Sequence, residues 1–279
     1  MNKSKVGVIG NGFVGEAISF AFSSVADVYV YDIDPSRCLN DLESVHNCDF
    51  VFVCVPTPMS ENGSQDLSFV ESVFEMATEI PIYILKSTVL PGTTENLNKK
   101  YPNFKIIFSP EFLTERTAKL DMLTQSRIIL GGDLSLTEKS KILFNNRFKI
   151  KNIIQTDSKT AELTKYMNNT FFATKVSIMN EFKLLCDKIG ANWENALTGF
   201  VSDGRIGDSH LNVPGHDGKL GYGGTCFPKD VSSLIVFAKD FGIELNTIQG
   251  GWKTNLELRP EKDWEKKYGR SVSYKNQQS

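Results

Sequence analysis

Short apolar runs alternate with helical patterns along the first half of the chain. The apolar runs cover residues 5–9, 28–31, 49–55, 82–86, 105–109, 127–131 and 152–156. Buried strands that alternate with helices are typical of a doubly wound parallel sheet. We therefore predict an α/β fold with an N-terminal Rossmann-type domain at residues 1–156, followed by a helical domain built on one long helix.

The long helix is predicted from the change of pattern near Asp157. Asp157 or Ser158 is suited to the N-cap, and the helical spacing continues until just before Gly190. Its apolar positions include Leu163, Tyr166, Phe171, Ile178, Phe182 and Leu185. Such a stripe is expected to pack against a domain or a second subunit. We predict a central dimerisation domain at 157–256, a homodimer, and a polar tail at 257–279.

A glycine-rich loop follows the first predicted strand. The sequence Gly10-Asn11-Gly12-Phe13-Val14-Gly15 joins the strand at 5–9 to a helical pattern, which is the setting of a dinucleotide-binding loop. The glycines would allow a pyrophosphate to approach the helix N-terminus. Asp32 ends the strand at 28–31, at the spacing where a carboxylate binds the adenosine ribose of NAD and repels the phosphate of NADP. The alternative is a turn with only a structural role. The succession of strand, glycine loop, helix, strand and acid favours NAD binding instead.

Cys226 stands in the sequence Gly221-Tyr222-Gly223-Gly224-Thr225-Cys226-Phe227-Pro228-Lys229-Asp230. Pro228 suits the first turn of a helix, and the run Val231–Phe241 is helical in pattern. Cys226 would then lie at a helix N-terminus with Lys229 nearby, an environment that favours a reactive thiolate. The other cysteines are interpreted as small buried apolar residues, and five cysteines without C-x-x-C spacing predict reduced thiols.

Three further groups of polar residues could take part in chemistry. The run at 86–93 ends a strand in hydroxyl groups at the edge where doubly wound sheets bind ligands. Glu111 and Glu115 are four residues apart and would share one face if their segment were helical. Lys165 and Asn169 have the same spacing in the long helix. Taken singly, each group also has a structural alternative. The hydroxyl groups could cap the strand end, the two acids could be solvated, and Lys165 could be a surface lysine.

Composition excludes several classes of protein. Among 279 residues, 41% are hydrophobic, and 31 Lys and Arg against 33 Asp and Glu leave a net charge of -2. This balance gives no reason to expect binding to nucleic acid or to a membrane. No apolar run is long enough to span a bilayer, and we expect a cytoplasmic protein. His210 and His216 lack the spacing of a zinc site, so no metal is predicted.

The chain resembles the UDP-glucose/GDP-mannose dehydrogenase family. The matching segments besides the glycine loop are Val55-Pro56-Thr57-Pro58, Ser87-Thr88-Val89, Pro110-Glu111-Phe112-Leu113, Ala161-Glu162-Leu163-Thr164-Lys165 with Asn169, Gly204-Arg205-Ile206-Gly207 and Gly223 to Asp230. The resemblance implies NAD-dependent oxidation of a nucleotide-sugar CH2OH to a carboxylate, as from UDP-glucose to UDP-glucuronate for polysaccharide biosynthesis. Phe227 favours the branch of the family that acts on UDP-glucose.

The resemblance also implies roles for single residues. Cys226 would form the covalent intermediate, Lys165 and Asn169 would stabilise the alkoxide and oxyanion, Asp230 and Thr88 would position water and relay protons, and Glu111 would serve thioester hydrolysis. The implied NAD contacts are Gly10, Gly12, Phe13, Val14, Gly15, Asp32, Arg37, Thr57, Thr88, Glu115 and Lys229. The implied substrate contacts are Glu111, Lys165, Asn169, Gly223 and Arg205, the last from a neighbouring subunit.

One departure from the family concerns the C-terminus. Members usually carry a further α/β domain that binds the nucleotide sugar and would start near Asn255-Leu256, but here only the expected polar tail follows that point. Two alternatives to the family reaction therefore stay open. One is a dehydrogenase of another nucleotide sugar or of a smaller hydroxylated substrate, and the other is an NAD-binding protein without turnover.

Overall fold

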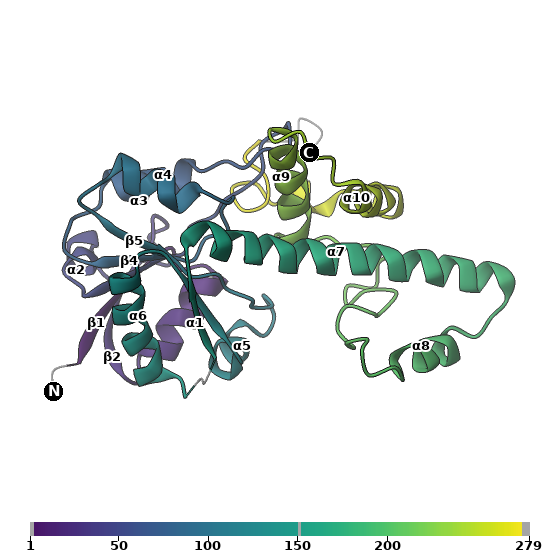
Figure 1. Cartoon of the computed structure of the whole chain (residues 1–279), viewed down its shortest axis with the longest axis horizontal. Coiled ribbons are helices and arrows are strands. Elements are labelled where there is room, and N and C mark those ends of the chain that lie inside the picture. Colours follow the sequence, from purple (N-terminus) through teal and green to yellow (C-terminus); the bar gives the residue numbers. More distant parts are fainter. Residues whose placement is uncertain (1–2, 150–151, 275–279) are drawn as a thin grey trace. The chain divides into compact units, whose positions relative to one another are not determined.

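The chain forms two compact units in the computed structural model, which describes residues 3–149 and 152–274 (Figure 1). The first unit combines the residues up to Thr57 with Asp66–Lys165. The second combines Pro58–Gln65 with the residues from Tyr166 onward. The first unit therefore extends past the boundary expected at residue 156, because the first turns of the long helix group with the sheet.

Within the described part of the chain, the first unit contains a seven-stranded sheet of order β2-β1-β3-β4-β5-β6-β7. The strands are β1 (Ser4–Ile9), β2 (Ala26–Tyr31), β3 (Phe50–Val53), β4 (Ile82–Leu85), β5 (Lys105–Phe108), β6 (Ile128–Gly131) and β7 (Ile153–Thr156). The predicted α/β, Rossmann-type fold is confirmed. The sheet is parallel except at one junction, where Phe108 of β5 and Gly131 of β6 pair antiparallel. An apolar run shows where a strand lies but not its direction.

Helices cover both faces of this sheet. They are α1 (Phe13–Phe22), α2 (Leu42–His46), α3 (Ser68–Glu75), α4 (Thr93–Lys100), α5 (Ala118–Thr124) and α6 (Leu134–Arg147). Val8 and Phe52 pack in one core cluster with α1, α5 and α6. Ile9 and Val53 pack in the other with α2, α3 and α4. Since successive side chains of a strand point to opposite faces, strands covered on both sides must be apolar at nearly every position.

The second unit is helical, as predicted. Its helices are α7 (Ser158–Ile189), whose first turns belong to the first unit, α8 (Trp193–Val201), α9 (Phe227–Lys239), α10 (Asn246–Leu258) and the 3-10 helix η1 (Asp263–Lys266). The long helix begins where the sequence placed it, with the Asp157 carboxylate accepting a hydrogen bond from the Thr160 N–H at 2.8 Å. It ends before Gly190, whose φ is +73°. Across residues 3–149 and 152–274, none of the helices is long and apolar enough to cross a membrane.

The segment after α10 folds onto the second unit, whereas a polar tail was expected at 257–279. Trp264 is 1% exposed, and its ring lies 5.5 Å from that of Trp252. Val272 is buried and forms a β-bridge with Met59, in the short segment that the N-terminal half contributes to this unit. Trp264 and Val272 are isolated apolar residues among many charged ones. The sequence therefore shows no periodic pattern there that would predict their burial. The rest of the expected tail, residues 275–279, lies outside the described residues.

A buried carboxyl group connects α7 to α4 within the first unit. Glu162 is fully buried and accepts hydrogen bonds from the Gly92 N–H at 2.6 Å and the Thr94 N–H at 2.8 Å. Burial raises the pKa of Glu162 to about 7, although these hydrogen bonds act in the opposite direction. The folded state therefore holds a proton on Glu162 at pH values where the unfolded chain has lost it.

This proton should make the stability contributed by Glu162 depend on pH. The contribution is fully present below the ordinary glutamate pKa of 4.5 and is lost as the pH rises through about 7. We expect the difference in unfolding free energy between wild type and Glu162→Gln to fall by up to about 3 kcal/mol over this pH range. This corresponds to about 1.4 kcal/mol for each unit by which the folded and unfolded pKa values differ. Urea unfolding at a series of pH values measures it. Glu138→Gln, at an exposed site on α6, should show no such trend.

Candidate functional site

The glycine loop of the first unit joins β1 to α1 at the carboxyl edge of the sheet, beside the point where the strand order reverses between β1 and β3. Gly10 has a φ of +91°, and a Cβ on it would lie 2.8 Å from the Cys54 carbonyl oxygen. A Cβ on Gly15 would lie 2.0 Å from the Gly10 carbonyl oxygen. The packing of the protein itself therefore requires glycine at both positions.

Gly12 differs from these two glycines, because a Cβ on it would meet nothing within 4 Å. It is the N-cap residue of α1, and no side chain of the described residues caps that helix end. Open space over uncapped N–H groups fits the pyrophosphate of a dinucleotide. Phe13 and Val14 pack their side chains against the core, so a cofactor would contact them through their backbone.

Asp32 lies next to this loop, directly after β2. Its carboxylate accepts hydrogen bonds from the Asn11 N–H at 2.5 Å and the Asp34 N–H at 2.8 Å. These bonds hold Asp32 against the glycine loop, which is the position that a ribose-binding carboxylate needs. Arg37 is exposed, and its Nε lies 3.5 Å from the Asp34 carboxylate.

The other predicted cofactor contacts of the first unit lie on loops that follow β3, β4 and β5. Thr57 is buried, and its hydroxyl donates to the Thr88 carbonyl oxygen at 2.7 Å. Glu115 is exposed, whereas Glu111 is 7% exposed. Residues 111–114 are not helical, so the condition under which the two acids would share one face is not met.

Glu111 instead pairs with a cation from α7. The Lys165 ammonium donates to the Glu111 carboxylate at 2.9 Å and to the Glu111 carbonyl oxygen at 2.6 Å, and both side chains are buried. Burial alone would raise the pKa of Glu111, but the charge of Lys165 and the hydrogen bond from the Leu113 N–H hold it below its usual value. Glu111 is therefore ionised at neutral pH and can accept a hydrogen bond from a water molecule.

Lys86, for which no role was predicted, belongs to the same buried group. Its ammonium donates to the Pro110 carbonyl oxygen at 2.9 Å and to the Ser109 hydroxyl at 3.3 Å. Burial lowers the pKa of Lys86 to about 8. The sequence did indicate that Lys86 could be buried, because this lysine directly follows Ile82–Leu85, a strand made only of apolar residues and tyrosine.

The second unit holds the cysteine. Cys226 is partly buried and directly precedes α9, with Pro228 in the first turn, as the sequence predicted. Asp230 is 1% exposed, and its N–H donates to the Cys226 carbonyl oxygen at 3.0 Å. The Asp230 carboxylate accepts hydrogen bonds from Asn169 Nδ2 and from the Lys229 ammonium, both at 2.6 Å. A cysteine at a helix N-terminus thus stands one turn before a buried, fully hydrogen-bonded carboxylate.

Two predicted substrate contacts of the second unit have different surroundings. The Arg205 side chain is 89% exposed and forms an ion pair with Asp203. It is therefore accessible to another molecule. Gly223 is confined, because a Cβ on it would lie 2.5 Å from the Asp263 carboxylate. The absence of a side chain at Gly223 is thus already required by contacts within the protein.

Asp32 is expected to decide which cofactor binds. Asp32→Ala should weaken NAD binding by about tenfold or more, because hydrogen bonds to a charged group contribute about 1.5–3 kcal/mol. The same change should narrow the difference between NAD and NADP, since the repelling charge is gone. Calorimetric titration with both cofactors measures this, with Asp34→Ala as the matched control. Equal binding of NADP by the wild type would contradict this role of Asp32.

Two models of one protein family match the chain. The NAD binding domain of the UDP-glucose/GDP-mannose dehydrogenase family matches residues 37–147, and the central domain of that family matches residues 159–257. A UDP-glucose 6-dehydrogenase of Rickettsia bellii is 35% identical over 225 residues, which are 77% of this chain and 51% of that protein. The chain spans about half the length of this relative and of a UDP-glucose 6-dehydrogenase of Rickettsia conorii.

Solved structures agree with these matches. A UDP-glucose dehydrogenase from Pyrobaculum islandicum superposes with a TM-score of 0.82 at 27% identity, over 93% of this chain and 69% of that one. A 3-hydroxyisobutyrate dehydrogenase from Mycobacterium tuberculosis has a TM-score of 0.73 at 15% identity, over 93% of this chain and 95% of that one, which shows a shared fold alone. With both domain models matched in order, the chain belongs to the UDP-glucose/GDP-mannose dehydrogenase family and carries its NAD-binding and central domains.

Proposed function

We propose that this protein oxidises the CH2OH group of a nucleotide sugar to a carboxylate through a covalent intermediate on Cys226, and that the substrate is UDP-glucose. The observation that carries the proposal is the place of Cys226 at the N-terminus of α9, one turn before Asp230. A helix N-terminus favours the thiolate, which is the nucleophilic form of cysteine. The names of the relatives in Rickettsia bellii and Pyrobaculum islandicum support UDP-glucose.

Each proposed step has a group in the chain that suits it. Two NAD+ molecules, bound one after the other, would each accept one hydride: the first from the CH2OH group, which leaves the C6 aldehyde, and the second from the thiohemiacetal. The Cys226 thiolate adds to the C6 aldehyde, forming a C–S bond and a thiohemiacetal, and loss of a second hydride leaves a thioester. Water then breaks the C–S bond, which returns the thiolate and releases the carboxylate. Lys165 and Asn169 are the proposed donors to the developing oxygen charges, where one donor is worth roughly 3–4 kcal/mol.

The bases for this chemistry are proposed to be carboxylates held in the ionised form. Glu111, with its pKa lowered by Lys165, is the proposed base for the water that cleaves the thioester. Asp230, which accepts hydrogen bonds from Asn169 and Lys229, and Thr88 are the proposed groups that position water and pass protons. The NAD contacts remain those proposed from the sequence: the glycine loop, Asp32, Arg37, Thr57, Thr88, Glu115 and Lys229.

We also propose that the protein acts as a homodimer through the long helix. Six side chains of α7 that follow one another at helical spacing are 44–67% exposed. They are Met167, Phe171, Ile178, Phe182, Leu185 and Ile189. Tyr166, expected in the same stripe, is buried and its hydroxyl accepts a hydrogen bond from Gln65 instead. An exposed apolar stripe of this length marks a contact with another chain.

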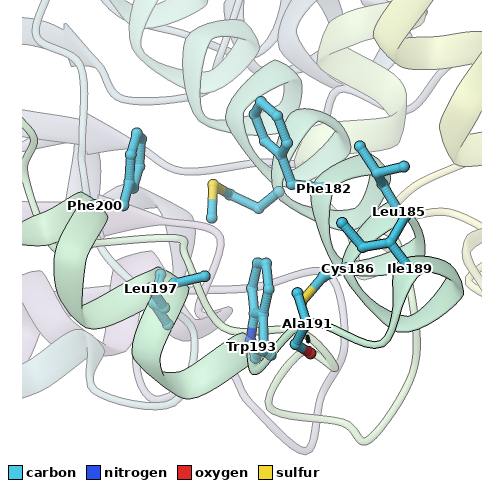
Figure 2. Close-up of a pocket in the computed structure, with 10 residues that line it drawn as sticks. Phe182, Leu185, Cys186, Ile189, Ala191, Trp193, Leu197 and Phe200 are labelled. Atoms are coloured by element: carbon cyan, nitrogen blue, oxygen red, sulfur yellow. Dashed lines mark hydrogen bonds between the residues drawn. The ribbon is translucent and has the colours of Figure 1, made fainter.

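The apolar stripe continues into a pocket. This pocket has a volume of about 270 Å³. Phe182, Leu185 and Ile189 of α7 and Leu197 and Phe200 of α8 line it (Figure 2). Its lining is almost wholly apolar, which suits side chains of a second copy better than a charged substrate. Arg205, exposed in the loop after α8, is the residue proposed to reach the substrate of the partner subunit.

A substrate panel tests the proposed function. NADH formation would be followed with UDP-glucose, other UDP- and GDP-sugars, free glucose and small hydroxy acids. We expect UDP-glucose to be the best substrate, with two NADH formed for each carboxylate. Turnover of a small hydroxy acid alone would favour the alternative dehydrogenase. NAD binding without any turnover would show that the isolated chain is a cofactor-binding protein.

A further inference from the structure

The backbone that leads to Cys226 is held by amide side chains from two helices. Asn180 of α7 accepts a hydrogen bond from the Gly221 N–H at 3.0 Å. Asn255 of α10, fully buried, accepts from the Tyr222 N–H at 2.6 Å and donates to the Tyr222 carbonyl oxygen at 3.0 Å. Gly221 has a φ of +67°, and a Cβ on it would lie 2.5 Å from Asn255 Oδ1. Side chains of α7 and α10 thus replace the partners that a loop backbone would otherwise find in water.

The next two residues of the loop contact an ion cluster whose arginine is buried and whose two carboxylates are partly exposed. The Arg259 guanidinium is 3% exposed, donates to Asp263 at 2.5 Å and also pairs with Asp217. The other oxygen of Asp263 accepts from the Gly224 N–H at 3.4 Å. A Cβ on Gly223 would lie 2.7 Å from Arg259 Cζ. The loop therefore lies directly against the cluster, and only glycine fits between them.

We propose that Arg259 and Asp263 are positioning residues, which hold the Gly221–Gly224 backbone so that Cys226 is presented at the N-terminus of α9 with the correct orientation. Their effect on turnover rests on the proposed function. A side chain that forms a covalent intermediate must be held within a fraction of an ångström of its productive position. Residues that fix the backbone around it are needed for this.

The position of the two residues in the chain adds to this inference. Both follow residue 257, where the match to the central domain of the family ends. The segment that contains them is part of the second unit, since Trp264 packs on Trp252 and Val272 pairs with Met59. The segment expected as a polar tail therefore supplies the charges that hold the catalytic loop.

Alkylation of Cys226 by iodoacetamide tests the proposal without any turnover. The rate would be followed by mass spectrometry of the Cys226 peptide from neutral to alkaline pH. Asp263→Asn keeps the shape but weakens the ion pair with Arg259 that holds the loop, and we expect it to slow alkylation at neutral pH severalfold, because Cys226 is then less well held at the positive end of α9. NAD binding should change little, because all of its proposed contacts except Lys229 lie in the other unit. Glu261→Gln is the matched control, because Glu261 lies in the same segment and pairs at the surface with Lys219.

A second variant keeps the test decisive if Asp263→Asn does not fold. Arg259→Lys retains the positive charge but loses the planar fork that bonds both carboxylates, so a smaller slowing in the same direction is expected. A folded variant of either kind with the alkylation profile of Glu261→Gln would overturn the proposal. If the wild type turns over no nucleotide sugar, the proposed function fails, while the comparison of alkylation rates still decides the role of Arg259 and Asp263.

Discussion

Cys226→Ser is expected to abolish formation of the carboxylate product while NAD binding stays intact. Serine is nearly the same size as cysteine, but its hydroxyl is not ionised at neutral pH, so the covalent step fails. The loss should amount to several orders of magnitude, as for other nucleophiles that form covalent intermediates. Product analysis by chromatography and NAD titration of the same sample measure the two quantities. A slow release of aldehyde, or a stalled adduct, would agree with loss of the second oxidation only.

The matched control for this variant is Cys38→Ser. Cys38 is also partly buried, but it lies in the first unit and its thiol donates to the Asn40 carbonyl oxygen. This change should leave turnover near that of the wild type. Full turnover by Cys226→Ser would refute the thioester mechanism, whatever the behaviour of the control.

Mixing two inactive variants is expected to restore activity if the active site is shared between subunits. Arg205→Ala and Cys226→Ser should each be inactive or nearly so as homodimers. A mixed dimer has one site in which Cys226 of one chain meets Arg205 of the other, and one site that lacks both. With random exchange of chains, about a quarter of wild-type activity should return, because a symmetric dimer repeats the same contact twice.

The control for this experiment is a mixture of two Cys226→Ser chains that carry different affinity tags, which should stay inactive. The same tags allow mixed dimers to be isolated and counted by native mass spectrometry. Absence of activity in isolated mixed dimers would refute the shared site. Absence of dimers of any kind would refute the proposed role of the apolar stripe on α7.

Local patterns in the sequence were sufficient for the elements that carry the chemistry. The glycine loop, the strand that ends at Asp32, the long helix from Ser158 to Ile189 and the place of Cys226 before α9 were all predicted. Each depends on residues that are neighbours in the chain: a glycine spacing, an apolar period, a proline in a first turn. These signals act over one or two turns, so they can be read without knowledge of the rest of the fold.

Contacts between distant segments were decided only by the tertiary structure. The sequence could not show that Glu111 pairs with Lys165, 54 residues away, or that β6 runs antiparallel to β5. It gave no reason to connect Arg259 with Asp217 or with the loop before Cys226. A charged residue has the same appearance in the sequence whether it is solvated or buried, and only packing brings it a partner. The sequence therefore determined which groups can react, and the tertiary structure determined which charges hold them in place.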